Sequence, residues 1–266
     1  MKAFIQTNFK GMPFNETVYN AYYGFEELGV ETIFYREASD IKDTPKEDIV
    51  IGGVFPTKWK LEQLGFEYPE LDYPEELKGY LGRNIWRSKI NTINSNEDLW
   101  PVFVKPYVDK KFTGRVIRST EDLIGCGSCY ENYDVICSDV IDIMAEWRAF
   151  IRYGRVLDVR RYKGDWRTHY DPVIIKNCVK EFKSQPAAFS MDFGVTVDGK
   201  TVLIEVNDGF SIGSYGLFHI DYAKLLATRW SELVGIEDEF DFTNEKLYWM
   251  ECGFGPKQLA QTVQKW

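Results

Sequence analysis

Apolar residues near the start of the chain follow two different spacings. Short apolar runs occur at residues 3–5, 30–35 and 48–54, and each has the length of a strand. From Asn15 to Gly29, between the first two runs, apolar residues recur every three or four positions, which predicts a helix that ends at the glycine. Alternation of strands and helices predicts a small α/β domain with parallel strand pairing.

From residue 100 onward the pattern changes to strands in which polar residues occupy alternate positions, which predicts an antiparallel part and an α/β or α+β fold class. A last helix is predicted at about residues 218–234, with apolar residues along one side. Residues 56–100, rich in Pro, Tyr and charge, predict short helices and connections. The predicted strands cover residues 101–106, 115–118, 134–141, 146–152, 156–162 and the stretch 189–209, which holds two strands.

Composition narrows the class of protein and its partners. Hydrophobic residues make up 44% of the 266 residues, which predicts a globular chain with one large or two modest domains. No apolar run approaches the roughly 18 residues that cross a bilayer, and the start lacks the apolar core of a secretory signal, so we expect a cytoplasmic protein without a membrane partner. A net charge of −9 argues against nucleic acid and requires local Lys and Arg for any anionic substrate.

The cysteines do not predict a disulfide framework or a redox centre. There are five, an odd number scattered through a long chain, which favours reduced thiols. Cys126 and Cys129 form a lone C-x-x-C. Because no second pair and no strand-then-helix context accompany it, neither a zinc site nor a thioredoxin-type role is expected.

The stretch 189–209 places acidic residues opposite each other. Residues 197–200 read Val-Asp-Gly-Lys, a sequence typical of a two-residue type I′ turn, so Asp192 is predicted to pair with Glu205. Asn207 then projects on the same side. The other side is predicted to be core and consists of Met191, Phe193, Val195, Val202, Ile204 and Val206.

Two carboxylates placed directly opposite each other destabilise a sheet unless a cation lies between them. Few, hard oxygen ligands of this kind suit Mg²⁺, which keeps other coordination positions for water and phosphate. The hairpin alone is equally compatible with a solvated face that carries incidental acids.

Two basic segments accompany the acids. The strand 102–106 ends near Lys105, and the polar tip after it, residues 107–116, contains one glycine and is suited to folding over phosphates. It is not a Walker A loop, because no G-x-x-x-x-G-K-[ST] occurs in the chain. Taken singly, a lysine at the end of a strand is more often a surface charge.

A second predicted hairpin turns at residues 153–154 and gathers arginines beside Glu146. With a two-residue turn Glu146 faces Arg161, with Arg148 on the same side, and a bulge would substitute Arg160. Guanidinium groups are suited to phosphate oxygens and to the charge that develops in phosphoryl transfer. The alternative is a cross-strand ion pair on a solvated face.

The order of these motifs resembles the ATP-grasp superfamily, which includes D-alanine:D-alanine ligase and amino-acid ligases that modify peptides. In that family the last three residues follow the pattern D-x(12)-E-x-N, which Asp192, Glu205 and Asn207 match in type and spacing. The paired arginines and sparse lysines are similar to a bacterial and phage clade named for two arginines and a lysine. The resemblance covers roughly residues 85–235.

The resemblance implies a small N-terminal α/β domain at residues 1–85, followed by an ATP-grasp domain at residues 86–266. In the latter, two antiparallel-rich α+β lobes, at about 95–137 and about 138–240, would clasp ATP.

The resemblance also implies roles for single residues. Lys105 would contact the α- and β-phosphates or adenine N7. Ser138, Asp139 and Val140 would form the hinge whose backbone reads adenine, and Glu146 would bind the ribose hydroxyls.

The phosphate lid would contain Lys111, Thr113 and Gly114. One or two Mg²⁺ ions, with Mn²⁺ as an allowed substitute, would be held by Asp192, Glu205 and Asn207.

Two departures from the family pattern leave the acceptor site and the substrate open. The usual earlier lysine is not evident near residues 83–89, where Arg87 or Lys89 is the candidate substitute. Residues 208–216 lack the Pro-Gly often found after the last ligand.

The activity that the resemblance implies is ATP-dependent carboxylate-amine ligation. ATP would phosphorylate a carboxylate to an acylphosphate, with Arg148 and Arg160 or Arg161 on the transferred group, and an amine would displace phosphate to leave an amide or peptide bond. The expected partners are a small-molecule or peptide carboxylate and an amine, and a homodimer is allowed. The alternatives are a kinase-like phosphotransferase of the same fold and a non-catalytic ATP-binding protein.

Overall fold

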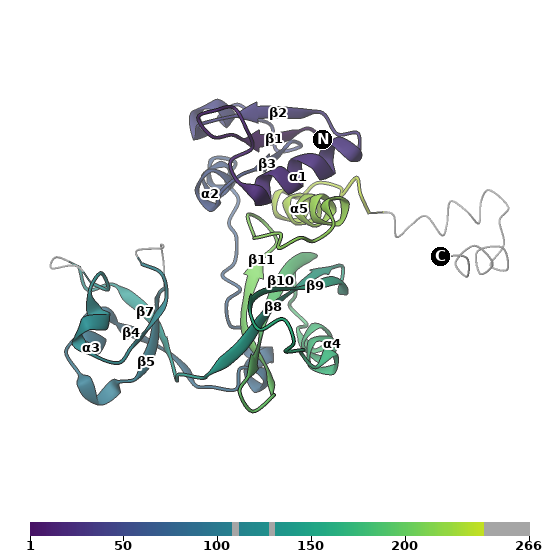
Figure 1. Cartoon of the computed structure of the whole chain (residues 1–266). Helices are drawn as coiled ribbons and strands as arrows, with labels where there is room; N and C mark the ends of the chain where they lie inside the picture. Colours follow the sequence, from purple (N-terminus) through teal and green to yellow (C-terminus); the bar gives the residue numbers. More distant parts are fainter. Residues whose placement is uncertain (108–111, 128–130, 242–266) are drawn as a thin grey trace, which may run out of the picture.

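The structure is a computed structural model that describes residues 1–107, 112–127 and 131–241. It contains a three-stranded sheet and two four-stranded sheets, which follow one another along the chain and are spatially separate in Figure 1. The mixture of one parallel and two antiparallel sheets with helices confirms the predicted fold class. The domain boundaries given above stay predictions.

The first sheet is parallel, with strand order β2-β1-β3, as the sequence predicts. Asn15 begins the following helix by accepting a hydrogen bond from the Val18 amide, and Gly29, just after the helix, has a φ of +74° that favours glycine. The elements of this unit are β1 (Ala3–Gln6), α1 (Glu16–Glu27), β2 (Thr32–Tyr35), η1 (Ala38–Ile41), β3 (Ile49–Ile51) and α2 (Val54–Gln63).

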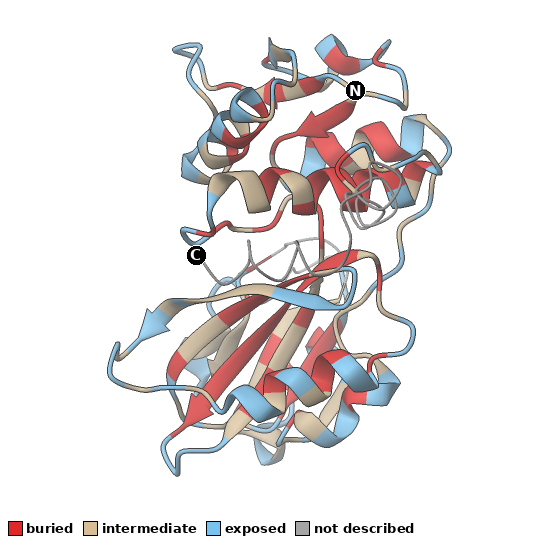
Figure 2. Cartoon of the chain, turned by 90° about the vertical axis from the view of Figure 1, so that its right-hand side faces the viewer, coloured by how far each residue is buried: buried red, intermediate tan, exposed pale blue. Residues whose placement is uncertain are grey.

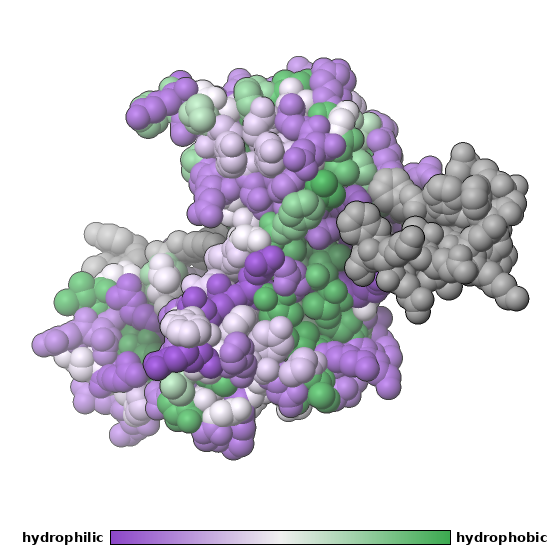
Figure 3. Space-filling model, turned by 45° about the vertical axis from the view of Figure 1, so that its right-hand side comes forward, coloured by the Kyte–Doolittle hydropathy of each residue, from purple (hydrophilic) through white to green (hydrophobic). Residues whose placement is uncertain are grey.

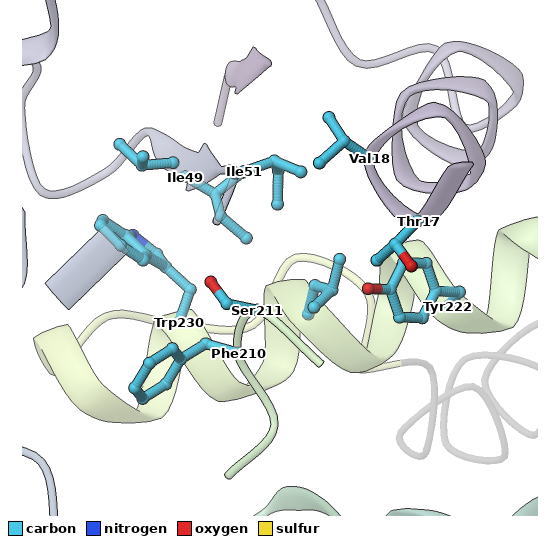
Figure 4. A pocket seen from close by; sticks show the side chains of 11 residues that line it. Thr17, Val18, Ile49, Ile51, Phe210, Ser211, Tyr222 and Trp230 are labelled. Atoms are coloured by element: carbon cyan, nitrogen blue, oxygen red, sulfur yellow. The ribbon is translucent and has the colours of Figure 1, made fainter. Parts of the chain in front are cut away.

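The last described helix, α5 (His219–Val234), returns to this first unit and packs against α1 (Figure 1). Its buried residues include Tyr222 and Trp230, which share one core with the first sheet. Figure 4 shows a cavity between these layers, with Ser211 from the loop before α5. Its volume of about 10 Å³ is near the minimum for one water, so it is not a substrate site.

The second sheet is antiparallel, with strand order β4-β7-β5-β6, and has its own core around Ile90, Val104 and Cys137. It stands apart at the lower left of Figure 1, and we call it the small sheet. Its elements are β4 (Ile85–Lys89), α3 (Ile90–Asn94), η3 (Glu97–Leu99), β5 (Val102–Pro106), β6 (Arg115–Ile117), η4 (Thr120–Leu123) and β7 (Asp134–Ser138), and η2 (Glu75–Tyr80) precedes it.

The third sheet is antiparallel, with strand order β11-β10-β8-β9, and we call it the large sheet. One face packs on α4, a helix that the sequence interpretation did not include; Figure 2 shows its exposed outer side and the buried strands behind it. The elements are β8 (Ile143–Arg152), β9 (Arg155–Gly164), α4 (Pro172–Glu181), β10 (Ala188–Thr196) and β11 (Thr201–Asp208).

The helices and the surface of the protein relate to two expectations from composition, the absence of a membrane-spanning segment and a largely polar exterior. Among the described residues no helix is long and apolar enough to cross a membrane. On the face seen in Figure 3 the first unit is largely hydrophilic, and hydrophobic surface gathers where it meets the large sheet.

The turn between β10 and β11 is not the predicted two-residue type I′ turn. Val195 pairs with Thr201, and β10 ends at Thr196, so residues 197–200 form a longer connection, and Gly199 but not Asp198 has a positive φ. A register shift beyond Phe193 restores the predicted pair of Asp192 with Glu205. The same shift corrects the predicted core.

Leu203, and not Ile204, pairs with Phe193 and is fully buried with it. Because the shift adds one residue to β11 at Ile204, side chains on either side of that residue follow different registers. Two errors in the sequence interpretation, the turn length and the missing bulge, thus cancelled at Glu205.

The second hairpin has the predicted turn at Tyr153 and Gly154, which both have positive φ. Its pairing is shifted twice, however, so Glu146 faces Lys163 and not Arg161. Arg160 faces Arg148, so it lies on the face where a bulge was expected to put it, but it does not face Glu146.

Candidate functional site

A single row of charged residues crosses the large sheet on the face opposite α4. Arg160 pairs with Arg148, Arg148 with Asp192, and Asp192 with Glu205, so β9, β8, β10 and β11 each contribute one member. Directly paired residues project from the same face, and the neighbouring rows on the opposite face supply the core under α4. The sequence prediction that Asp192 and Glu205 share a face is therefore confirmed by the register.

Arg148 and Asp192 form a buried, two-point ion pair. The Arg148 Nε and Nη2 atoms donate to Asp192 Oδ1 and Oδ2, each at 2.7 Å, and both residues are at most 6% exposed. Asn207 Nδ2 donates to Asp192 Oδ2 at 3.3 Å, and the Tyr162 hydroxyl lies 3.5 Å from the same oxygen. Asp192 is thus held in one orientation by three neighbours.

Glu205 is bonded to a lysine that comes from the small sheet. Lys105 Nζ on β5 lies 2.9 Å from Glu205 Oε2 and 3.2 Å from Asp72 Oδ2. Burial would lower the pKa of Lys105, but the charges of the Glu205 and Asp72 carboxylates, together with Tyr73, outweigh it and raise that pKa. The ammonium is therefore a permanent charge that joins the two sheets.

The same contact sets the protonation of Glu205. Burial would raise the pKa of Glu205, but the Lys105 charge and hydrogen bond outweigh it and hold the pKa below its usual value. The pKa of Asp72, by contrast, is raised because its burial exceeds the effect of Lys105. The acids that were expected to need a cation between them are therefore neutralised by Arg148 and Lys105.

The small sheet presents a second cation beside Lys105. Arg87 on β4 and Lys105 on β5 both pair with Ile136 on β7, so the two project from one face. The Arg87 guanidinium lies 3.8 Å from the Tyr107 ring centroid and bonds to its hydroxyl at 2.5 Å. Lys89, the other candidate for the missing lysine, is paired with Asp134 on the surface.

The predicted hinge connects the two sheets. Ser138 ends β7 and is 3% exposed, and Asp139 follows it, with its carboxylate accepting hydrogen bonds from Asn84 at 2.7 and 3.1 Å. Among the described residues, the backbone groups of Val140 and Ile141 make no hydrogen bond. This connection between β7 and β8 therefore offers backbone donors and acceptors between the two sheets.

Glu146 lies two residues before Arg148 on β8 and is mostly buried, with 15% of its side chain exposed. It is bonded to Lys163 across the strand pair. The structure thus places it on β8 beside the charged row, with a lysine as its partner in place of the expected arginine.

The predicted phosphate lid lies partly outside the described residues. Lys111 falls in that part of the chain. Thr113 is exposed, and Gly114 lies so close to the small sheet that a Cβ atom would come within 3.1 Å of Lys105 Cβ and 2.8 Å of Phe103 Cζ. A side chain at Gly114 would therefore collide with the strand that carries Lys105.

The two arginines left open by the sequence differ in position. Arg160 lies in the charged row and forms an ion pair with Asp158 at 2.5 Å. Arg161 pairs with Trp147 on the other face, is exposed, and donates to the Gly164 carbonyl at 2.7 Å. In this register Arg160, and not Arg161, lies on the face of Arg148. Which of the two arginines faces the phosphates stays a prediction.

The side chains predicted to hold a divalent ion have the right chemical type, but Glu205 would first have to release Lys105. Within the described ranges, no group of three or more Cys, His, Asp and Glu side chains is placed to hold a metal ion. The set here has two carboxylates and the amide of Asn207, which are hard oxygen donors suited to Mg²⁺. Asp192 is occupied by Arg148, so Glu205, once released by Lys105 and with Asn207 beside it, is the carboxylate available to an ion.

Sequence reasoning missed the aromatic residues and the acid around this site. Tyr162 and Tyr215 stack with ring centroids 4.8 Å apart, and the Arg148 guanidinium lies 4.9 Å from the Tyr215 centroid. Tyr162 follows Arg160 by two residues, so strand alternation could have indicated its face. Tyr215 and Asp72 lie in irregular segments, for which the sequence carried no such signal.

A groove of about 720 Å³ lies next to Asp72 and Tyr73. It is bounded by segment 69–76, by Trp86, Arg87 and Tyr107 on the side of the small sheet, and by Phe182, residues 184–186, Arg229 and Glu232. Asp192 and Glu205 do not line it, so the charged row and this groove meet only at the residues beside Lys105.

Comparison with known protein families gives a match. The sequence pattern of the family described as "ATP-grasp domain, R2K clade family 2" matches residues 80–225, more than half of the chain. This range includes Lys105, Arg148, Asp192 and Glu205. No curated protein sequence matches the chain.

Solved structures with similar folds cover most of this chain. The ATP-grasp ligase PsnB, complexed with a phosphomimetic variant of its minimal precursor, Mg and ADP, has a TM-score of 0.53 at 12% identity, over 86% of this chain and 97% of that one. D-alanine–D-alanine ligase from Bacillus anthracis has a TM-score of 0.51 at 13% identity, over 88% and 97%. N5-carboxyaminoimidazole ribonucleotide synthetase from Thermotoga maritima has 0.52 at 13%, over 88% and 76%. At these identities the likeness is one of fold.

Proposed function

Because the chain belongs to the ATP-grasp domain family of R2K clade family 2, we propose that it is an ATP-dependent carboxylate-amine ligase. ATP would phosphorylate the carboxylate of one substrate, giving an acylphosphate and ADP, and an amine would then displace phosphate to form an amide. The acid is a small molecule or a peptide. The observation that carries the proposal is the Lys105 to Glu205 contact, which brings a buried cation of the small sheet onto the charged row of the large sheet.

Nucleotide binding would use both sheets. The hinge backbone at Val140 and Ile141 is suited to the adenine edge, because its donors and acceptors have no partner among the described residues. Glu146 would accept hydrogen bonds from the ribose once Lys163 yields. Lys105 and Arg87 project from one face of the small sheet and would meet the phosphates.

Phosphoryl transfer would depend on charge placed in advance along the row. A bound Mg²⁺, held by Glu205 and Asn207 with Asp192 beside them, would neutralise phosphate charge. Lys105 would exchange the Glu205 carboxylate for a phosphate oxygen, which keeps its charge paired throughout. Arg160, whose side chain is 42% exposed beside Arg148 and is paired with Asp158, would exchange this partner for the transferred group.

The two substrates would meet the row at the end covered by the loop before α5. There Tyr162 and Tyr215 stack above Arg148, and Ser211 of the same loop bonds to Thr57 Oγ1 of α2 at 2.9 Å. The first unit of the chain and the large sheet are thus joined where an acyl group would have to approach.

An ADP-release screen over amino acids and short peptides, with Mg²⁺ present, tests the proposal. We expect release that requires both an acid and an amine, and a Glu205→Gln variant at least about 100-fold slower, since one charged contact typically contributes about 2.7–4 kcal/mol to the barrier. The matched control is Glu31→Gln, which also removes a carboxylate bonded to a lysine, Lys2 at 2.9 Å, but on the surface of the first unit.

The outcomes separate the proposal from its rivals. Release of ADP without consumption of an amine would instead identify a phosphotransferase. Calorimetric binding of Mg-ATP without any turnover would indicate a non-catalytic nucleotide-binding protein. Normal ADP release by Glu205→Gln would contradict the role of the charged row.

A further inference from the structure

Glu205 reaches the charged row only because β11 contains an extra residue, and we propose that Arg83 is the positioning residue that holds this bulge. The effect of Arg83 on catalysis rests on the proposed function. Its effect on the register of β11 does not. Arg83 lies outside the strands, between η2 and β4, and is partly buried.

The register of β11 changes at Ile204. Towards the turn, Val195 pairs with Thr201 and Phe193 pairs with Leu203. Beyond it, Asp192 pairs with Glu205, and Ile204 has no partner on β10. One residue of β11 is therefore accommodated outside the regular ladder.

A strand without this bulge would turn Glu205 to the wrong face. If the register next to the turn continued, Asp192 would pair with Ile204, and Glu205 would pair with Met191. Met191 is fully buried in the core under α4. A slip of one residue moves every following side chain to the other face, so the carboxylate would leave the charged row.

Arg83 bonds to the bulge from the open edge of the sheet. β11 is an edge strand, so its outward carbonyls have no strand partner. Arg83 Nη2 donates to the Ile204 carbonyl at 2.7 Å, and Nη1 donates to the Leu203 carbonyl at 3.0 Å. A third bond, from Nη1 to the Leu81 carbonyl at 2.9 Å, fixes the guanidinium to its own segment.

Residues near Arg83 in the sequence also contact β11 on both sides of the bulge. Gly82, with a φ of +63°, lies so close to Val202 that a Cβ atom would come within 2.6 Å of Val202 Cγ1. On the other side of the bulge the Val206 amide donates to the Asp72 carbonyl at 2.9 Å. The planar guanidinium thus lies between the Gly82–Val202 approach and the backbone hydrogen bond of Val206, and it supplies two donors to consecutive carbonyls.

The test measures how much Mg²⁺ strengthens binding of AMPPNP, as the ratio of the dissociation constants without and with the metal. For wild-type protein we expect a ratio of at least about 10. Arg83→Met should bring the ratio close to 1, as Glu205→Gln should, because the carboxylate no longer faces the metal. Lys60→Met is the matched control, because Lys60 is also a buried cation that donates to a backbone carbonyl, that of Lys42 at 2.8 Å.

Rescue distinguishes positioning from a general loss of stability. Deletion of Ile204 makes the ladder regular while Asp192 still faces Glu205, so no bulge has to be held. The variant that combines this deletion with Arg83→Met should regain at least half of the wild-type ratio on a logarithmic scale. A ratio unchanged in Arg83→Met, or equally reduced in Lys60→Met, would overturn the inference, as would the absence of rescue.

If the protein binds no nucleotide, that result counts against the proposed function and not against the role of Arg83. A second measurement, made without ligand, then tests the role of Arg83. In a double-mutant cycle without ligand, Lys105→Met and Glu205→Gln should be coupled in the wild-type background. The coupling should vanish in the Arg83→Met background, since Lys105 then has no Glu205 carboxylate to meet. Equal coupling in both backgrounds would refute the role of Arg83.

Discussion

Single residues in the charged row have partners that explain why opposed acids are tolerated. Asp192 and Glu205 face each other, yet each carboxylate is bonded to its own cation, Arg148 or Lys105. Because one cation belongs to the same sheet and the other to the small sheet, the two pairs differ in kind. The first lies within one sheet, whereas the second joins two sheets and is, in the proposed function, the pair that a ligand would replace.

The Glu205 to Lys105 pair predicts a dependence of stability on pH. The pKa of Glu205 is lowered in the folded protein, so the pair stabilises above the unfolded value of about 4.5 and its contribution is lost as pH falls through the lower, folded value. We expect wild type to exceed Glu205→Gln in unfolding free energy by about 1–2 kcal/mol at pH 7. Urea unfolding of both proteins at several pH values would measure the difference.

The difference should shrink below pH 4.5 and approach zero when Glu205 is protonated. A difference that grows as pH falls would show that burial, and not Lys105, dominates the pKa of this carboxyl. The comparison with the variant cancels the titration of groups that Glu205 does not influence, whereas the pKa values of Asp72 and Asp192, which the Glu205 charge raises, change with it.

At the scale of elements, the pair that joins β8 to β10 is predicted to be structural. Arg148→Met leaves the buried Asp192 carboxylate without its cation and should cost about 3–5 kcal/mol of unfolding free energy. Arg160→Met on β9 removes a half-exposed pair with Asp158 and should cost less than about 1 kcal/mol. Denaturant titration of the two variants checks this contrast, and equal costs would contradict it.

The elements predicted from sequence are those with a strong local signal. The parallel strands, α1 with its Asn15 cap and Gly29 end, α5, and the turn at residues 153–154 follow the predictions because spacing and turn residues act locally. Helix α4 was not included in the interpretation. The bulges in β9 and β11 could not be placed, because they depend on contacts with distant segments.

The residues of the site likewise divide into those that a local sequence pattern indicated and those that it did not. Acids and basic residues on regular strands were identified by type and alternation, and the register brings Arg148, Asp192 and Glu205 into one row. Asp72, Tyr215 and Arg83 lie in irregular segments, where no periodicity states which way a side chain points. Their positions follow from tertiary contacts alone.

At the scale of the whole molecule, the charged row lies where three parts of the chain meet. The small sheet supplies Lys105, the large sheet supplies the row, and the first unit contacts the loop that covers its end through Thr57. The net charge of −9 is thus offset locally by Lys105, Arg87, Arg148 and Arg160, as an anionic substrate requires.

The most direct test of this account is anomalous diffraction from crystals of the protein grown with AMPPNP and Mn²⁺. We predict a manganese peak at about 2.0–2.3 Å from oxygens of Glu205 and Asn207, with Lys105 Nζ moved from Glu205 to a phosphate. A nucleotide bound with no peak at these residues, or a peak while the Lys105 to Glu205 pair remains intact, would contradict the account.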